Sequence, residues 1–126
     1  MVKALIVEDN ETSGKLLQAI LGAEGFETAL AADGQEALKI LESQKVDCIV
    51  SDVMMPNIDG YRLIYKVRRD SRLKSIPFIM YTAASLSRED EEFAMRLGVN
   101  KYIRKPGNAK DIVQAIHELL PSSGNG

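Results

Sequence analysis

The 126-residue sequence contains one cysteine, one histidine and no tryptophan. A lone cysteine cannot form a disulfide within the chain, and one cysteine with one histidine cannot build a zinc site of the usual composition. Cys48 lies inside a short apolar run, so we expect a buried packing residue rather than a reactive thiol. His117 lies in a strongly periodic helical segment, and we expect it on the surface of that helix.

Long apolar runs and an excess of basic charge are also missing. No apolar run approaches the roughly 20 residues that a membrane-spanning helix needs. The amino terminus, "MVKALIVEDN", becomes acidic too early for a signal peptide. The formal net charge of −2 and the pI of about 5.4 give no electrostatic reason to expect nucleic-acid binding. We therefore expect a cytoplasmic protein that neither enters the membrane nor binds nucleic acid directly.

The length and composition are those of one globular domain. A chain of this length can bury a single sizeable core, and 45% hydrophobic with 27% charged residues is ordinary for such a domain. We expect that domain to occupy residues 1–120. The last six residues, "PSSGNG", cannot continue a helix and are interpreted as a flexible tail or the start of a linker, 121–126.

Short apolar runs alternate with segments of helical periodicity. The predicted strands are 4–7, 26–31, 48–50, 77–81 and 102–103, and the predicted helices are 11–24, 34–44, 60–69, 88–97 and 109–120. The apolar faces of the first and fourth helices are expected to include Leu16 and Phe93. Repeated strand–helix alternation predicts an α/β fold with a parallel sheet that helices cover on both faces, and 26–31 is expected at an edge.

Polar side chains follow four of the predicted strands. In an open parallel sheet the functional crevice lies beyond the carboxyl ends of the strands, so these side chains are expected to converge. They are Glu8 and Asp9, Asp52, Thr82 and Lys105. Taken singly, each has an ordinary interpretation as a helix-cap acid, a loop cap, a strand-end threonine or a solvated lysine. The functional hypothesis depends on their joint placement.

Three clustered carboxylates raise one another's pKa unless a cation lies among them. Mg²⁺ is the natural candidate, because it takes oxygen ligands and is commonly bound by one or two carboxylates and phosphate oxygens. With Lys105 and Thr82, the ion would form a receptor for phosphoryl oxygens, and Asp52 would be the nucleophile.

The segments "LIVEDN", "IVSDVMMPNIDGYRLIYKVR", "FIMYTA" and "RLGVNKYIRKP" carry a family resemblance. Over residues 2–120 the chain resembles a response-regulator receiver domain of two-component signalling, of the chemotaxis-regulator type. The resemblance implies a flavodoxin-like (βα)5 fold whose five parallel strands are ordered 2-1-3-4-5.

The resemblance also implies a role for each matched residue. Asp52 is the phosphoacceptor, and Glu8, Asp9, Asp52 and the backbone carbonyl of Met54 hold Mg²⁺, with Mn²⁺ as a substitute. Thr82 and Lys105 bind the phosphoryl group, Thr82 and Tyr102 form the conformational switch, and Pro106 follows a cis peptide bond. Three departures stand out: Glu8 in place of an aspartate, Gly107 after Pro106, and Asn100-Lys101 where many DNA-binding regulators have acids.

The expected function is therefore that of a signalling switch rather than a metabolic enzyme. Asp52 would accept a phosphoryl group from a sensor histidine kinase or a histidine phosphotransfer protein, and the domain would catalyse that acceptance and its own slow dephosphorylation. The 88–120 face would then control an output domain or effector. The chain fills one receiver, as a single-domain regulator or as a fragment of a larger one.

Three other classes remain as alternatives. A pseudo-receiver would bind partners without phosphate. A flavodoxin-like FMN protein would need backbone donors for phosphate after the first strand, where this chain has two acids. A phosphatase with an aspartate nucleophile generally carries a second aspartate two residues later, where this chain has Met54.

Overall fold

A computed structural model describes residues 1–55, 57–83, 87–105 and 109–120. The predicted cis-peptide position, Pro106, and the predicted tail, 121–126, lie outside the described residues. Within the described part of the chain, no helix is both long enough and apolar enough to cross a membrane.

All of the predicted strands and helices form, and every boundary lies within one residue of the one expected from the sequence. The strands are β1 Lys3–Val7, β2 Glu27–Ala31, β3 Cys48–Ser51, β4 Phe78–Thr82 and β5 Lys101–Arg104. The helices are α1 Glu11–Ala23, α2 Gly34–Ser43, α3 Gly60–Arg69, α4 Arg88–Leu97 and α5 Ala109–Leu119. The sheet is parallel with the order β2-β1-β3-β4-β5, which confirms the fold that the resemblance implied.

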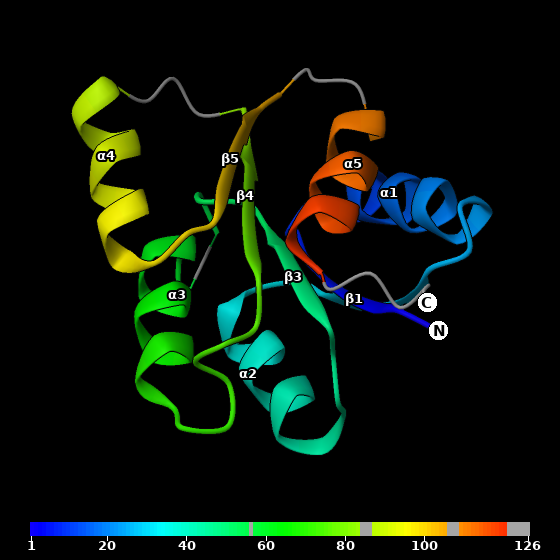
Figure 1. The fold of residues 1–126 in the computed structure, drawn as a ribbon, viewed down its shortest axis with the longest axis horizontal. Coiled ribbons are helices and arrows are strands. Elements are labelled where there is room, and N and C mark those ends of the chain that lie inside the picture. The colour runs from blue at the N-terminus through cyan, green and yellow to red at the C-terminus, as the bar shows by residue number, and fades with distance from the viewer. Residues whose placement is uncertain (56, 84–86, 106–108, 121–126) are drawn as a thin grey trace.

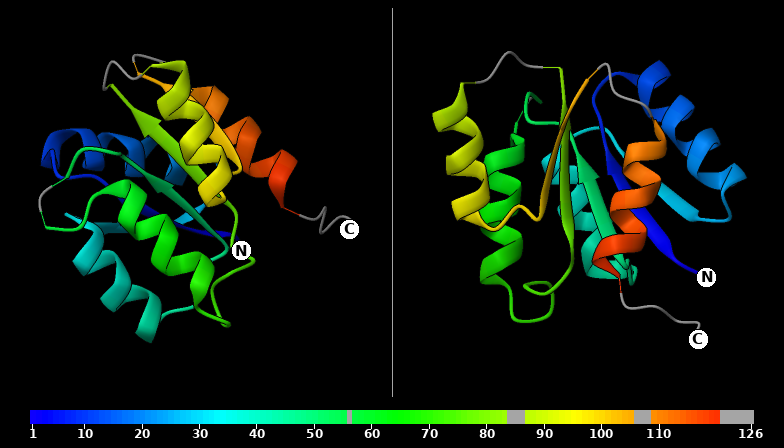
Figure 2. Two further views of the ribbon diagram at one scale, coloured as in Figure 1. Left: turned by 90° about the vertical axis from the view of Figure 1, so that its left-hand side faces the viewer. Right: turned by 45° about the horizontal axis from the view of Figure 1, so that its top comes forward.

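Helices cover both faces of the sheet. Helices α1 and α5 lie on one face, and α2, α3 and α4 lie on the other (Figures 1 and 2). Each face has its own apolar core: Ile6, Leu21 and Ile116 are buried on the α1–α5 side. Leu5 and Phe78 are buried on the opposite side, because successive strand residues point to opposite faces.

Polar caps fix where four of the helices begin. Asn10, Asp33, Asp59 and Ser87 each accept a hydrogen bond from a backbone N–H in the first turn of the helix that follows. These caps lie just beyond the carboxyl ends of β1 to β4. They therefore fix the loops at the end of the sheet where the polar side chains were expected to meet.

Two core predictions were wrong. Leu16 is 60% exposed and Phe93 is 45% exposed. Adjacent helical residues are about 100° apart, so the burial of Leu17 and Ala94 turns their preceding neighbours toward the surface. The predictions for Cys48 and His117 were correct, since Cys48 is buried and His117 is exposed.

Candidate functional site

Asp52 is held at the end of β3 by its backbone and by its own loop. Its N–H donates to the carbonyl of Val7 at 3.0 Å, which aligns the ends of β3 and β1. Its Oδ1 accepts the N–H of Val53 at 2.7 Å, with the N–H of Met54 at 3.4 Å. The side chain is 13% exposed, so the carboxylate is partly desolvated and its orientation is fixed by backbone donors.

Two further carboxylates approach Asp52 from the end of β1. Glu8 is 8% exposed, and its Oε2 accepts the N–H of Asn10 at 3.1 Å. Asp9 is exposed. One carboxylate oxygen from each of Glu8, Asp9 and Asp52 can be chosen so that all three lie within 4.8 Å of one another. The sequence-based expectation that these acids converge is therefore met.

Lys105 reaches the same acids from the end of β5. Its Nζ lies 2.5 Å from Glu8 Oε1 and 3.4 Å from Asp52 Oδ2. Burial by itself would lower the pKa of this ammonium, but hydrogen bonds and charge attraction from Glu8 and Asp52 outweigh burial and raise the pKa. Nζ also lies 5.2 Å from the centre of the Tyr81 ring, a cation–π contact that the sequence did not predict.

The donor set fits a hard divalent cation. Glu8, Asp9 and Asp52 offer only oxygen atoms to a metal ion. Among the described residues, these three carboxylates are accompanied by the single ammonium of Lys105, which pairs with Glu8 and Asp52 and leaves an excess of negative charge. Met54 is 65% exposed, and its thioether is too soft a ligand for such an ion, so only its backbone carbonyl suits the role that the resemblance implies. Its role as a ligand remains a prediction.

The loop after Asp52 is anchored at both of its ends. The N–H of Gly60 donates to the Val53 carbonyl at 2.9 Å, and a Cβ on Gly60 would lie 2.5 Å from the Asp52 carbonyl oxygen. Farther along the loop, Asn57 has a φ of 66° and its Nδ2 donates to Asp33 Oδ2 at 2.8 Å. Asparagine tolerates this left-handed conformation better than most residues. That anchor was missed at the sequence level, although an asparagine ahead of Asp-Gly is a turn signal.

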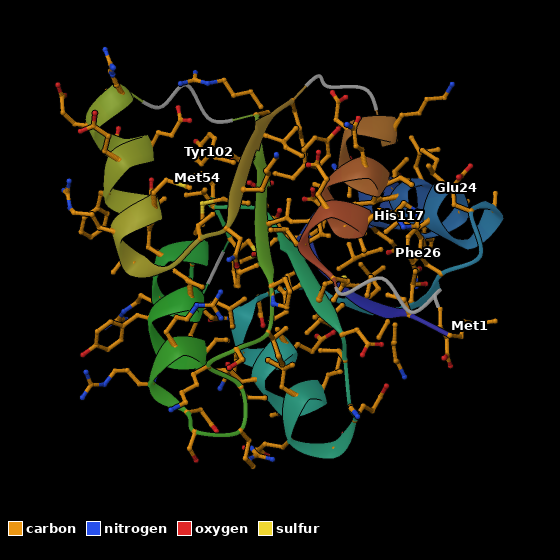
Figure 3. The ribbon with its side chains drawn as sticks, in the orientation of Figure 1. Met1, Glu24, Phe26, Met54, Tyr102 and His117 are labelled. Atoms are coloured by element: carbon orange, nitrogen blue, oxygen red, sulfur yellow. The ribbon has the colours of Figure 1, made fainter. Side chains whose placement is uncertain are left out.

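Thr82 is the last residue of β4, not a residue beyond it as the sequence suggested, and it is 1% exposed. Its carbonyl accepts the N–H of Lys105 at 2.8 Å. Tyr102 pairs with Met80 in the β4–β5 register, so the side chains of Tyr102, Met80 and Thr82 share one face of the sheet. Figure 3 shows Tyr102 on the α3–α4 side of β5.

The comparison with protein families identifies the class of this domain. The family model for the response regulator receiver domain matches residues 4–117. The chain therefore belongs to the receiver-domain family of two-component response regulators.

Curated relatives and solved structures agree with this assignment. The chain is 36% identical over 123 residues to a probable transcriptional regulator, ycf27, of Cyanophora paradoxa, covering 98% of this chain and 50% of the relative. It is 35% identical over 125 residues to the alkaline phosphatase synthesis transcriptional regulatory protein PhoP of Bacillus subtilis, covering 96% and 49%. The chain thus spans about half the length of these relatives.

Two solved structures are similar over nearly their whole length. The chemotaxis protein CheY4 of Vibrio cholerae superposes with a TM-score of 0.88 at 31% identity, covering 95% of this chain and 99% of that one. The receiver domain of the sensor histidine kinase PA1611 of Pseudomonas aeruginosa superposes with a TM-score of 0.84 at 30% identity, covering 94% and 96%. That second structure has a magnesium ion coordinated in its active-site cleft.

Proposed function

We propose that this receiver domain accepts a phosphoryl group on Asp52 in a Mg²⁺-dependent reaction and acts as a conformational switch. The observation that carries the proposal is the convergence of three carboxylates, Glu8, Asp9 and Asp52, within 4.8 Å. Two of them, Glu8 and Asp52, also contact the Lys105 ammonium. Such a cluster suits the binding of a divalent ion and of a phosphoryl group together.

In the proposed reaction a carboxylate oxygen of Asp52 attacks the phosphorus of a phosphohistidine. A phosphorus–oxygen bond forms, the phosphorus–nitrogen bond breaks, and the imidazole of the donor leaves with the bonding electron pair. The Val53 N–H holds Oδ1 in place, which reduces the freedom that the nucleophile must lose. Bound Mg²⁺, held by Glu8, Asp9, Asp52 and the Met54 carbonyl, would supply positive charge to the phosphoryl oxygens; Mn²⁺ is expected to substitute.

Lys105 and Thr82 would complete the phosphoryl site. The Lys105 ammonium already lies 3.4 Å from Asp52 Oδ2, so it is placed to pair with oxygens added to that carboxylate. Thr82 shares a face of the sheet with Tyr102, which supports the proposal that a movement of Thr82 is relayed to Tyr102.

The proposed phosphodonor is a sensor histidine kinase or a histidine phosphotransfer protein, and the proposed output surface is the described part of residues 88–120. The name of one relative describes a transcriptional regulatory protein. We propose by analogy that this receiver acts on an output domain or a separate effector. A cytoplasmic location and the absence of direct nucleic-acid binding remain predictions from the sequence.

The decisive test is intact mass after incubation with acetyl phosphate, with Mg²⁺, with Mn²⁺ and without a metal ion. We expect one phosphoryl group on the wild type only when a metal ion is present, and none on Asp52→Asn. Asp111→Asn, which changes an exposed acid on α5, is the matched control and should be labelled like the wild type. Metal-independent labelling, or labelling of Asp52→Asn, would contradict the proposal.

Fast self-dephosphorylation could hide the labelled form, so beryllofluoride provides a second readout. We expect a stable complex with the wild type in the presence of Mg²⁺. Failure of both labelling and beryllofluoride binding would favour the pseudo-receiver alternative, in which the fold signals without phosphate.

A further inference from the structure

Tyr61, Phe93 and Tyr102 bring three structural elements together beside the candidate site. Tyr61 is in the first turn of α3, Phe93 is in α4, and Tyr102 is in β5. The rings of Tyr61 and Phe93 pack edge to face, with their centres 5.6 Å apart and their planes at 63°. Tyr61 and Tyr102 both pack against the apolar core on the α3–α4 side.

The hydroxyl groups of Tyr61 and Tyr102 are buried without a hydrogen-bond partner among the described residues. A buried hydroxyl without a partner loses its bonds to water and gains none in return, so this arrangement is costly. No other buried side-chain oxygen or nitrogen in the described part of the chain shares this condition. Two such groups therefore occur in one cluster rather than being scattered through the core.

The surroundings keep both phenols neutral. Burial raises the pKa of Tyr102 to about 12, and Tyr61 and the acids Glu91 and Asp90 add to the increase while Arg104 opposes it. Burial also raises the pKa of Tyr61, with further contributions from Asp90 and Asp59. Both groups therefore remain hydroxyls at neutral pH and keep their need for a hydrogen-bond acceptor and donor.

We propose that Tyr61 is a positioning residue for Tyr102. In the inward position of the Tyr102 ring, which this structure shows, the Tyr102 hydroxyl is buried, and the buried hydroxyl of Tyr61 makes that position less stable. Outward rotation of Tyr102 would carry its own hydroxyl to water and open space for water to reach the Tyr61 hydroxyl. The inward position thus leaves two hydroxyls unsatisfied, and the outward position relieves both. The Tyr61 hydroxyl therefore contributes to the free-energy difference between the two positions of the Tyr102 ring. An event that favours the inward position, such as phosphorylation of Asp52, must overcome this contribution.

The role of Tyr102 as a switch rests on the proposed function, but its ring position can be measured without phosphorylation. Nitration by tetranitromethane, located by peptide mass, proceeds through states in which a tyrosine is exposed. When ring rotation is fast relative to nitration, the rate at Tyr102 follows the outward population even if that population is small. Tyr65 is 51% exposed and provides an internal reference for reagent activity.

The test variant is Tyr61→Phe, which removes the hydroxyl and keeps the ring that packs against Phe93. We expect nitration of Tyr102 to slow about tenfold and the folding equilibrium constant from urea unfolding to rise about tenfold, because one unsatisfied buried hydroxyl has been removed. Tyr65→Phe is the matched control one turn later on α3, and it should change neither quantity by more than about twofold. Because this variant lacks the Tyr65 reference, nitration of Tyr81 reports reagent activity in it.

Three results would overturn the proposal. Faster nitration of Tyr102 with lower stability would mean that the two hydroxyls bond to each other in solution. Unchanged nitration and stability would mean that the Tyr61 hydroxyl has a partner, such as a bound water, in the inward state. A rise in stability without slower nitration of Tyr102 would assign Tyr61 a packing role only.

A further arm separates this inference from the proposed function. Beryllofluoride with Mg²⁺ should slow nitration of Tyr102 in the wild type, and Asp52→Asn should abolish that protection. If beryllofluoride does not slow nitration of Tyr102 while Tyr61→Phe behaves as expected, only the link to phosphorylation is contradicted. The comparison of Tyr61→Phe with the wild type would still decide whether Tyr61 positions Tyr102.

Discussion

Arg68 is the side chain through which α3 holds the segments leading into β4 and β5. Its guanidinium donates to the Gly98 carbonyl from Nε at 3.1 Å and from Nη2 at 2.8 Å, and to the Ile76 carbonyl from Nη1 at 2.7 Å. It also donates to the Lys74 carbonyl and to Asn100 Oδ1. Asn100 Oδ1 also accepts the N–H of Phe78 at 2.8 Å, so this side chain joins α3 to the start of β4.

The Arg68→Met substitution keeps an unbranched apolar stem and removes every one of these donors. Three of the bonds, two to Gly98 and one to Ile76, are partly buried, and a net contribution of about 1 kcal/mol each gives a loss of about 3 kcal/mol. The exposed bonds to Lys74 and Asn100 add little. For a domain of this size the loss corresponds to a fall in melting temperature of about 12 °C.

Urea unfolding followed by far-ultraviolet circular dichroism measures this loss directly. Arg69→Met is the matched control, because Arg69 is the exposed neighbour whose guanidinium lies 5.2 Å from the centre of the Tyr65 ring. That contact is worth about 0.5 kcal/mol at an exposed site. If Arg68→Met and Arg69→Met lose the same free energy of unfolding, the bonding pattern of Arg68 is not what stabilises this region.

Two further predictions concern the acceptor and its counter-ion. Gly60→Ala would place a Cβ 2.5 Å from the Asp52 carbonyl oxygen, so we expect the free energy of unfolding in urea to fall by about 2 kcal/mol and phosphoryl acceptance to slow. The control is Gly22→Ala, which has nothing within 4 Å of its Cβ and should not destabilise the protein. Lys105→Met should tighten Mg²⁺ binding about fivefold by calorimetry and slow phosphoryl acceptance, because the ammonium repels the bound metal ion by about 1 kcal/mol at this range. The control is Lys101→Met on the surface, which should leave the Mg²⁺ affinity unchanged. Weaker Mg²⁺ binding by Lys105→Met would contradict the argument.

The fold could be predicted from the sequence because its two periodicities are cleanly separated. Strands buried on both faces are short apolar runs, such as "ALIV" and "CIV", and the helices between them begin at polar caps such as Asp33 and Asp59. Alternation alone does not give the order of the strands, since right-handed crossovers permit several orders. That order came from the family resemblance and is confirmed by the pairing of the strands.

The candidate site was predictable to the extent that strand ends determine it. Glu8, Asp9, Asp52 and Lys105 follow their strands, so a parallel sheet brings them to one edge. The contacts among them depend on side-chain direction within loops, which no periodicity encodes. Sequence patterns therefore do not indicate that Lys105 contacts Glu8 more closely than Asp52, or that Asn57 anchors the acceptor loop to Asp33.

The pairing register of β4 and β5 places Thr82 of the candidate site on the same face of the sheet as Tyr102, which the sequence alone does not indicate. Met80 lies opposite Tyr102 and Thr82 opposite Arg104, and side chains two residues apart on a strand point to the same face. Thr82 and Tyr102 consequently share the α3–α4 face, while Tyr81 points to the other face and lies beneath Lys105. A slip of one residue in either strand would separate Thr82 from Tyr102 by the full thickness of the sheet. Any relay between them therefore depends on this pairing, and a change at Thr82 acts on the same layer in which Tyr61 and Tyr102 bury their hydroxyls.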